Sequence, residues 1–425
     1  MKKLIYLLAI PLVIASCKNQ SKNTSEETNE VIKDSTPTVQ TAIGEIELPA
    51  PFSTRSVSRP STVIDWPKEK TPTAPAGFKV TRFAEDLKHP RWTYIAPNGD
   101  VFVAEANTSK DSANRITLLR DTNGDEKVDE QHIYLEGLHQ NLGMLVLNNY
   151  FYVANTDGLY RYPYKKGANK ITSEGEKIVD LPAGGYNNHW TRNIISSKDG
   201  SKIYISVGSA SNVGEHGMEE EQRRASILEV NPDGSGEEIY ASGIRNPVGM
   251  DINPVTGELW TAVNERDGLG DNLVPDYITS VKKGGFYGWP FSYYGAINDP
   301  RWEEDPHQDM VEKTIIPDVP VGSHTASLGL TFYTADQFPN NYKNGAFVGQ
   351  HGSWNRANFA GYKVVFVPFS DGKPQQPQDF LTGFIANDEA GEVYGRPVDV
   401  TVTPKGSLLV NDDDAGIIWK VTAAN

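Results

Sequence analysis

Short segments in which hydrophobic and polar residues alternate recur six times along this chain. Each copy consists of a strand, a tight turn that contains Gly or Asn, and a second strand; the copies centre on residues 97–102, 147–152, 198–203, 255–260, 342–347 and 404–409. Most copies are separated by about 40–60 residues, the length of one propeller blade. Because one such unit cannot bury its own apolar face, the pattern predicts an all-β fold, a six-bladed β-propeller with four-stranded antiparallel blades.

A cluster of polar residues precedes the first strand of each copy. We expect these clusters to meet on the propeller axis, since the innermost strands of the blades line it. They are His89-Pro90-Arg91-Trp92, His139-Gln140-Asn141, His189-Trp190-Thr191-Arg192, Arg245-Asn246-Pro247, His324-Thr325-Ala326-Ser327 and Arg396-Pro397. Such residues hold structural water in many proteins. Several cations directed at one cavity nevertheless favour a polyanionic ligand, because guanidinium groups pair with carboxylate or phosphate.

The length and charge of the chain narrow the picture further. Its 425 residues suffice for one large domain with a substantial core. The formal net charge of −15 disfavours nucleic acid as a partner.

The N-terminus has the pattern of an export signal. Two lysines precede an apolar run that ends at Ile14-Ala15-Ser16-Cys17, and Cys17 is the only cysteine. Residues 1–16 are therefore predicted to be a signal peptide. The sequence before Cys17 resembles a bacterial lipobox, although a plain signal peptide with a chance cysteine is the alternative. We expect an exported lipoprotein, periplasmic or on the cell surface, held to a membrane by lipid on Cys17. Residues 17–65 are polar and are predicted to be a flexible tether, with the propeller at residues 66–425.

Two loops carry the residue types that bind hard cations. The first, residues 264–272, offers oxygens and carbonyls beside glycines, as Ca²⁺ prefers. The second has oxygens at four positions of a calcium-loop pattern, Asp121, Asn123, Asp125 and Asp129. It lacks the usual Gly and Glu of that pattern, and an ordinary Asp-Asn-Gly turn is the alternative. An aromatic segment at residues 284–295 fits either stacking on a planar cofactor or sugar, or core packing.

Several of these segments together resemble one enzyme family. His189, Arg245-Asn246-Pro247, the 264–272 loop and residues 284–290 look like the soluble PQQ-dependent aldose dehydrogenases, and most like the branch named L-sorbosone dehydrogenases. Residues 324–330, 349–356 and 394–398 extend the resemblance, which covers about residues 75 to 421.

The resemblance implies a propeller that binds pyrroloquinoline quinone (PQQ), a flat tricarboxylate, together with Ca²⁺. In that case His189 is the general base, and the main-chain carbonyls of Asp267 and Gly268 hold the calcium. The candidate cofactor contacts are Arg245, Asn246, Arg396, Arg356, Arg192 and His351. The candidate substrate contacts are Tyr287, Trp289 and His324.

Two departures from the family bear on the substrate. Ser209 stands where the glucose-oxidising members have an acidic residue next to the base, so nothing obvious orients His189 from that side. Val398 replaces a second arginine near Arg396. We therefore expect oxidation of a sugar or a sugar-derived aldehyde of the aldose or sorbosone type, with an external electron acceptor that the sequence does not identify. A calcium-dependent sugar lactonase and a non-catalytic binding propeller are the alternatives; a lactonase would need carboxylates around an axial metal, whereas the predicted axis is cationic.

Overall fold

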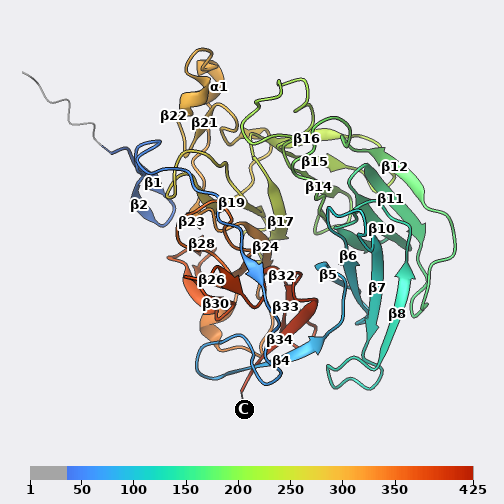
Figure 1. Cartoon of the computed structure of the whole chain (residues 1–425). Helices are drawn as coiled ribbons and strands as arrows, with labels where there is room; N and C mark the ends of the chain where they lie inside the picture. The colour runs from blue at the N-terminus through green and yellow to red at the C-terminus, as the bar shows by residue number, and fades with distance from the viewer. Residues whose placement is uncertain (1–35, 425) are drawn as a thin grey trace, which may run out of the picture. The chain divides into compact units, whose positions relative to one another are not determined.

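The computed structural model describes residues 36–424, which are almost entirely β-structure (Figure 1). Within this range the helical elements are α1 (Gln308–Val311) and the 3-10 turns η1 (Pro300–Trp302) and η2 (Asn340–Tyr342). No helix in residues 36–424 is long and apolar enough to cross a membrane. The predicted all-β class is confirmed. The predicted signal peptide and Cys17 lie outside the described residues.

Six sheets of four or five strands make up most of the described chain. Neighbouring strands are antiparallel except β16 and β20, which pair in parallel. Written from the first strand of each sheet, they are β5 (Pro90–Ile95), β6 (Val101–Glu105), β7 (Arg115–Arg120), β8 (Glu130–Leu135); β9 (Met144–Leu147), β10 (Tyr150–Asn155), β11 (Gly158–Pro163), β12 (Glu176–Asp180); β13 (Ile194–Ser196), β14 (Ile203–Val207), β15 (Ser226–Val230), β16 (Glu238–Ser242), β20 (Gly285–Phe286); β17 (Pro247–Ile252), β18 (Leu259–Val263), β19 (Pro275–Ser280), β23 (Val319–Ser323); β24 (Ser327–Phe332), β25 (Ala346–Gln350), β26 (Lys363–Val367), β29 (Gln378–Leu381); and β32 (Pro397–Val402), β33 (Leu408–Asp412), β34 (Ile417–Ala423), β4 (Phe78–Ala84).

The six predicted strand–turn–strand repeats are the first two strands of these six sheets. Each pair is antiparallel, as predicted. The second strand is buried along its whole length in β6, β18, β25 and β33. A strand covered on both faces by neighbouring sheets reads as a nearly continuous apolar run, which explains the composition of these segments.

The first strands of the six sheets contact one another in a closed ring, in the order β5, β9, β13, β17, β24, β32 and back to β5. Figure 1 shows β5, β17, β24 and β32 close together near the middle of the view. The sixth sheet combines the C-terminal strands β32 to β34 with β4 from the N-terminal part of the chain. The residues that begin the first strands therefore face a common axis.

Four smaller sheets complete the structure: β1 (Thr38–Thr41) with β2 (Gly44–Glu47); β3 (Thr62–Val63) with β31 (Glu392–Val393) and β30 (Ile385–Asn387); β21 (Ser292–Tyr293) with β22 (Ile297–Asn298); and β27 (Phe369–Ser370) with β28 (Lys373–Pro374).

The prediction of a flexible tether is wrong for residues 36–65. Val39 and Leu48 are buried in a core cluster with Leu269, and the amide of Ala42 donates to the carbonyl of Asp318 at 3.1 Å. Farther along, β3 pairs with β31. The few apolar residues of this segment suffice because they cover apolar surface that the sheets already present.

Candidate functional site

Two cavities lie along the ring of first strands, one where the strands begin and one farther along them. The larger, of about 260 Å³, is lined by all six first strands and includes the carboxylates of Asp251 and Asp399. Each accepts a backbone N–H from the next first strand, Asp399 from Thr93 at 2.8 Å and Asp251 from Phe332 at 2.7 Å. Burial raises the pKa of Asp251 to about 6 and that of Asp399 to about 7. Each carboxylate thus links its own sheet to the next one, so the acidic groups of this cavity have a structural role.

The second cavity, of about 190 Å³, lies where the polar clusters enter the first strands. Its lining is polar and aromatic and combines residues far apart in the sequence: Arg91, Asn188, His189, Trp190, Thr191, Asn246, Asn264, Ala326, Leu328, His351, Gly352, Trp354 and Arg396. Four predicted site residues are thus brought together, namely His189, Asn246, His351 and Arg396. Arg91 joins them from a predicted polar cluster, although it was not among the predicted ligand contacts.

His189 is held in one tautomer by the segment that follows β14. Its Nδ1 lies 2.9 Å from the carbonyl oxygen of Ser209 and 2.9 Å from the Ser209 hydroxyl. That hydroxyl donates to the carbonyl of Ser211 at 2.6 Å, and a carbonyl can only accept. Nδ1 therefore carries the proton, and the lone pair of the neutral ring is on Nε2. The expectation that nothing orients His189 from the Ser209 side is wrong, because the main-chain carbonyl does so.

The electrostatic surroundings keep this imidazole neutral. Burial, followed by the charge of Arg245, lowers the pKa of His189 to about 3. At neutral pH the ring is thus a proton acceptor. Gly208 allows its close packing, since a Cβ there would lie 2.6 Å from the His189 Cβ and 2.3 Å from the Asn246 Oδ1.

Asn246 contributes an acceptor that the protein leaves unused. Its Oδ1 is buried and has no hydrogen-bond partner among the described residues. An unpaired buried acceptor is unfavourable. The oxygen packs against Gly208, so the protein itself covers it.

The cations of the cavity are paired with carboxylates that the sequence prediction missed. Arg91 forms an ion pair with Asp413, and His351 Nε2 lies 2.8 Å from Asp413 Oδ1. Arg396 Nη1 lies 3.6 Å from Asp414. Burial, followed by the charge of Arg396, lowers the pKa of His351 to about 4. The pKa of Asp413 is lowered despite its burial, because His351 and Arg91 stabilise the anion.

The run of three aspartates at residues 412–414, directly after an apolar strand, is the sequence signal that could have revealed this pairing. The side chains of His351, Asp413 and Asp414 also form the one group of metal-ligand type found among residues 36–424. Arg91 Nη1 lies 3.3 Å from His351 Nε2, so a guanidinium already takes the place of a metal ion there.

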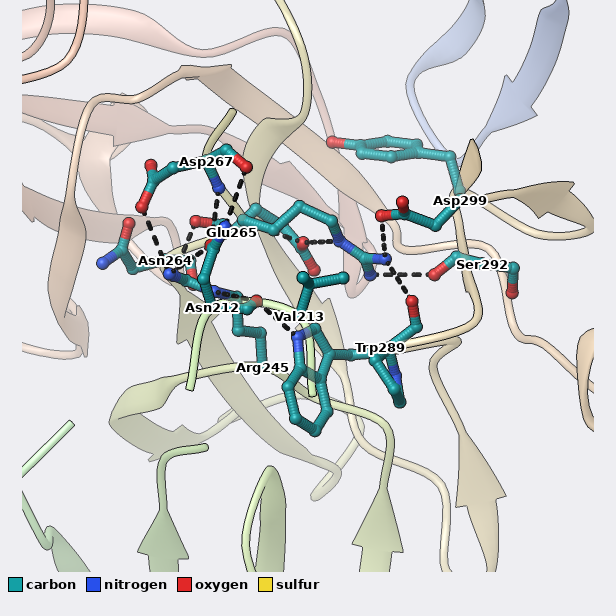
Figure 2. Close-up of polar contacts among 12 residues, drawn as sticks. Asn212, Val213, Arg245, Asn264, Glu265, Asp267, Trp289, Ser292 and Asp299 are labelled. Atoms are coloured by element: carbon teal, nitrogen blue, oxygen red, sulfur yellow. Dashed lines mark hydrogen bonds and ion pairs between the residues drawn. The ribbon is translucent and has the colours of Figure 1, made fainter. Parts of the chain in front are cut away.

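Arg245 does not face this cavity, contrary to the prediction that it binds cofactor. Figure 2 shows its guanidinium enclosed by Asn212, Asn264, Glu265 and Asp267. Nε donates to the Asn212 carbonyl at 3.1 Å, and Nη1 donates to the carbonyls of Asn264 and Glu265 at 3.1 and 2.7 Å. Nη2 contacts Asn212 Oδ1 at 2.9 Å and Asp267 Oδ2 at 3.2 Å. Its five N–H donors thus have protein acceptors, and Arg245 holds the 264–272 loop in place.

Arg192 is likewise internal. Its Nη1 donates to the carbonyls of His189 and Thr191, and its Nη2 to that of Pro182, at 2.7–3.0 Å. Burial lowers its pKa to about 9. Arg192 therefore fixes the backbone that carries His189 and does not line the cavity.

The predicted substrate contacts are also absent from the cavity lining. Tyr287 and Trp289 are each 2% exposed; the Tyr287 hydroxyl donates to the Ser280 carbonyl at 2.6 Å, and the Trp289 indole donates to the Asn212 carbonyl at 2.9 Å. His324 is buried between the carbonyl of Gly270 and the side chain of Asp267. Tyr287 and Trp289 thus pack in the core, which was the alternative stated for the aromatic segment.

Arg356, the remaining predicted cofactor contact, is also directed at the protein. Its Nη2 donates to Asn272 Oδ1 at 2.9 Å and its Nη1 to the Ser323 carbonyl at 3.3 Å.

Neither predicted calcium loop presents converging free oxygens. The Asp267 carbonyl accepts from Arg301 Nη1 at 2.7 Å and from Asn212 Nδ2 at 2.9 Å, so the residues around Asp267 and Gly268 do not fit a calcium ion. In the other loop, Asp121, Asn123, Asp125 and Asp129 accept N–H and O–H bonds from the loop itself. The ε-ammonium groups of Lys405 and Lys420 contact its carbonyls at Gly124 and Glu126.

Comparisons with known proteins agree with this architecture. The TrAA12-like family matches residues 72–279 and 301–424. An uncharacterised protein of Borreliella burgdorferi is 29% identical over 369 residues, 82% of this chain and 89% of its own length.

Two solved structures are similar at low sequence identity. The holo form of the PQQ domain of pyranose dehydrogenase from Coprinopsis cinerea has a TM-score of 0.68 at 20% identity, over 86% of this chain and all of that one. The calcium structure of the family AA12 carbohydrate-active enzyme from Trichoderma reesei has a TM-score of 0.68 at 17% identity, over 87% of this chain and 98% of that one. At these identities the likeness shows the fold.

Proposed function

The chain belongs to the TrAA12-like family, and on this premise we propose that it is a PQQ-dependent oxidoreductase that oxidises a sugar or a sugar-derived aldehyde. The six sheets are then the six blades of one propeller, and the cofactor binds in the 190 Å³ cavity. The observation that carries the proposal is His189, a neutral imidazole with its free nitrogen in a cavity lined by two arginines. Support from relatives comes from the PQQ domain of pyranose dehydrogenase.

The residues of the cavity fit a flat tricarboxylate. Arg91 and Arg396 line it and keep part of their donor capacity beyond their contacts with Asp413, Asp414 and main-chain carbonyls. Asn246 adds a neutral polar side chain to the lining. Trp354, which is 51% exposed, adds an aromatic face beside the polar groups.

The chain's own part in the reaction is proton transfer and positioning. Bound PQQ would supply the two-electron acceptor. His189 Nε2 would take the proton from a substrate hydroxyl or aldehyde hydrate, while the Ser209 carbonyl holds Nδ1–H and so stabilises the imidazolium as it forms. A pKa of about 3 makes the resting ring a weak base. Anionic groups that enter the cavity would offset the charge of Arg245 and raise that pKa toward the working pH.

Calcium is not assigned a step in this mechanism. The carbonyl predicted to hold it already accepts two N–H donors. The rival lactonase reading needs carboxylates around an axial metal, and the residues that line the 190 Å³ cavity include neither Asp nor Glu.

Titration of the purified, cofactor-free protein with PQQ tests the proposal, with the cofactor's absorbance as the readout. A dye-linked screen of aldoses and sugar aldehydes then identifies the substrate. Saturable binding together with turnover is the expected result. Absence of saturable PQQ binding would reject the oxidoreductase proposal in favour of a lactonase or a binding propeller. We also propose that the protein is exported and anchored through Cys17, with an electron acceptor still to be identified.

A further inference from the structure

Arg301 is fixed by a buried carboxylate. Arg301 lies two residues after Asp299, the N-cap residue of η1, and the Asp299 side chain is fully buried. Asp299 Oδ1 accepts from the Arg301 amide at 3.0 Å and from its Nε at 2.8 Å, and Oδ2 accepts from Nη2 at 2.7 Å. A guanidinium held in bidentate fashion has little freedom left. Its remaining nitrogen, Nη1, therefore points in one direction.

Arg301 Nη1 points toward the 264–272 loop. Nη1 lies 2.7 Å from the carbonyl oxygen of Asp267, whose second lone pair receives Asn212 Nδ2 at 2.9 Å. A Cβ on Gly268 would lie 3.4 Å from Nη1, and Gly268 has a φ of +93° that favours glycine. Since calcium–oxygen distances are about 2.3–2.6 Å, the guanidinium nitrogen stands almost where an ion on this carbonyl would stand.

The charges around Asp267 are balanced by side chains. Its Oδ2 pairs with Arg245 at 3.2 Å, and its Oδ1 lies 3.3 Å from His324 Nδ1. A divalent cation at the carbonyl would therefore adjoin the guanidinium groups of Arg301 and Arg245, and the carboxylate that could neutralise it is already paired. Repulsion between like charges in a poorly solvated site opposes such binding.

We propose that the guanidinium of Arg301 occupies the place of the divalent cation on the 264–272 loop, and that the protein binds its quinone cofactor without calcium there. The part of this proposal that concerns the quinone cofactor rests on the proposed function. The part that concerns Arg301 and the 264–272 loop does not, because those residues belong to the protein itself. Arg301 is thus a positioning residue that fixes the Asp267 carbonyl, and through Asp267 the partners Arg245 and His324.

The first experiment measures the melting temperature of EGTA-treated protein with and without millimolar CaCl₂. An ion present at about 100 times its Kd would raise Tm by about 3 °C in a domain of this size. We expect no rise for the wild type, and the same result for the Asp121→Asn variant, which replaces one of the four predicted ligands in the other calcium loop. Arg301→Ala should melt at a lower temperature and should regain about 3 °C with Ca²⁺.

Arg82→Ala is the matched control, because its side chain is 22% exposed against 24% for Arg301 and its ion-pair partner is Glu85. Calcium should leave the Tm of this variant unchanged. If Arg301→Ala fails to fold, the wild-type titration still decides the question. A Ca²⁺-dependent rise in wild-type Tm that persists in Asp121→Asn would overturn the proposal, as would an Arg301→Ala protein that does not respond to Ca²⁺.

The second experiment titrates the wild type with PQQ in EGTA and in CaCl₂. We expect the two affinities to agree within about twofold, a coupling of under 0.5 kcal/mol. Tighter binding of PQQ in CaCl₂ would overturn the proposal. Absence of PQQ binding in both buffers would instead reject the proposed function, while the melting experiment would still report on the loop.

Discussion

Replacement of His189 by glutamine should make the cofactor-free protein more resistant to acid. In the folded protein burial and Arg245 lower the pKa of His189 to about 3, against an ordinary value of 6.5. Between these two values the unfolded chain binds a proton that the folded protein does not. Protonation therefore favours unfolding, and stability is lost as pH falls from about 6.5 toward about 3. Glutamine does not titrate, so the variant escapes this loss.

The size of the effect follows from the two pKa values. Linkage with 6.5 in the unfolded chain and 3 in the folded one gives the wild type a loss of about 2 kcal/mol between pH 7 and pH 5. The free energy of unfolding of His189→Gln, relative to the wild type, should therefore rise by about 2 kcal/mol over the same interval. His351 titrates in the same direction, but it is common to both proteins and cancels.

Urea unfolding at several pH values, followed by tryptophan fluorescence, measures this difference. His139→Gln is the control, because His139 heads the second sheet in the same way but has a side chain that is 60% exposed. Parallel pH dependences for the wild type and His189→Gln would refute the argument that His189 is neutral and desolvated. They would also remove the structural basis for its assignment as the base.

The same variant separates catalysis from cofactor binding. Loss of a positioned general base should lower kcat by about 10²- to 10⁴-fold. The affinity for PQQ should change by only a few-fold, since the proton moves between substrate and imidazole. Full dye reduction by His189→Gln would exclude it from the mechanism.

The remaining predictions concern the arginines, the far cavity and the N-terminus. Arg91→Ala and Arg396→Ala should each weaken PQQ binding by about 10- to 100-fold, the equivalent of a charge-assisted hydrogen bond. Arg245→Ala should mainly lower Tm, because five protein acceptors lose their donors. Equal Tm values for all three variants would contradict this division. Burial raises the pKa of Asp399 to about 7, so the folded wild type loses stability as pH rises and this carboxyl gives up its proton. The free energy of unfolding of Asp399→Asn, relative to the wild type, should therefore rise by about 2–3 kcal/mol between pH 5 and pH 8 in urea unfolding. A pH-independent difference would count against that assignment. Cys17→Ser should leave the membrane fraction or remain unprocessed, and unchanged fractionation would disprove lipidation.

The positions of the strands and of the polar clusters could be predicted from the sequence. Alternation and turn residues act over a few positions, so they fix where a strand begins and which residues precede it. For that reason His189, Asn246 and Arg396 were placed correctly at the entry to the ring, and all three line the cavity. His351, which follows β25, also lines the cavity, but only the family resemblance indicated it.

The packing of residues 36–65 against the sheets could not be predicted in this way. Val39 and Leu48 are too few to form a core of their own, and their burial depends on surface offered by residues more than 200 positions away, such as Leu269. The hydrophobic effect depends on the area that is removed from water, and the segment's own sequence does not contain that area.

Which polar groups are free for a ligand was decided by the tertiary structure alone. Arg245 reaches Asn212 across 33 residues and Asn212 reaches Asp267 across 55, so a candidate cofactor contact and a candidate calcium ligand are already satisfied by protein. Arg301 completes the network from 34 residues away. A sequence reveals the type and the approximate place of a donor or acceptor. Whether its hydrogen-bonding capacity is already used depends on partners that only the folded chain brings within 3 Å, and this is why the residues that line the cavity differ from those that the motifs first indicated.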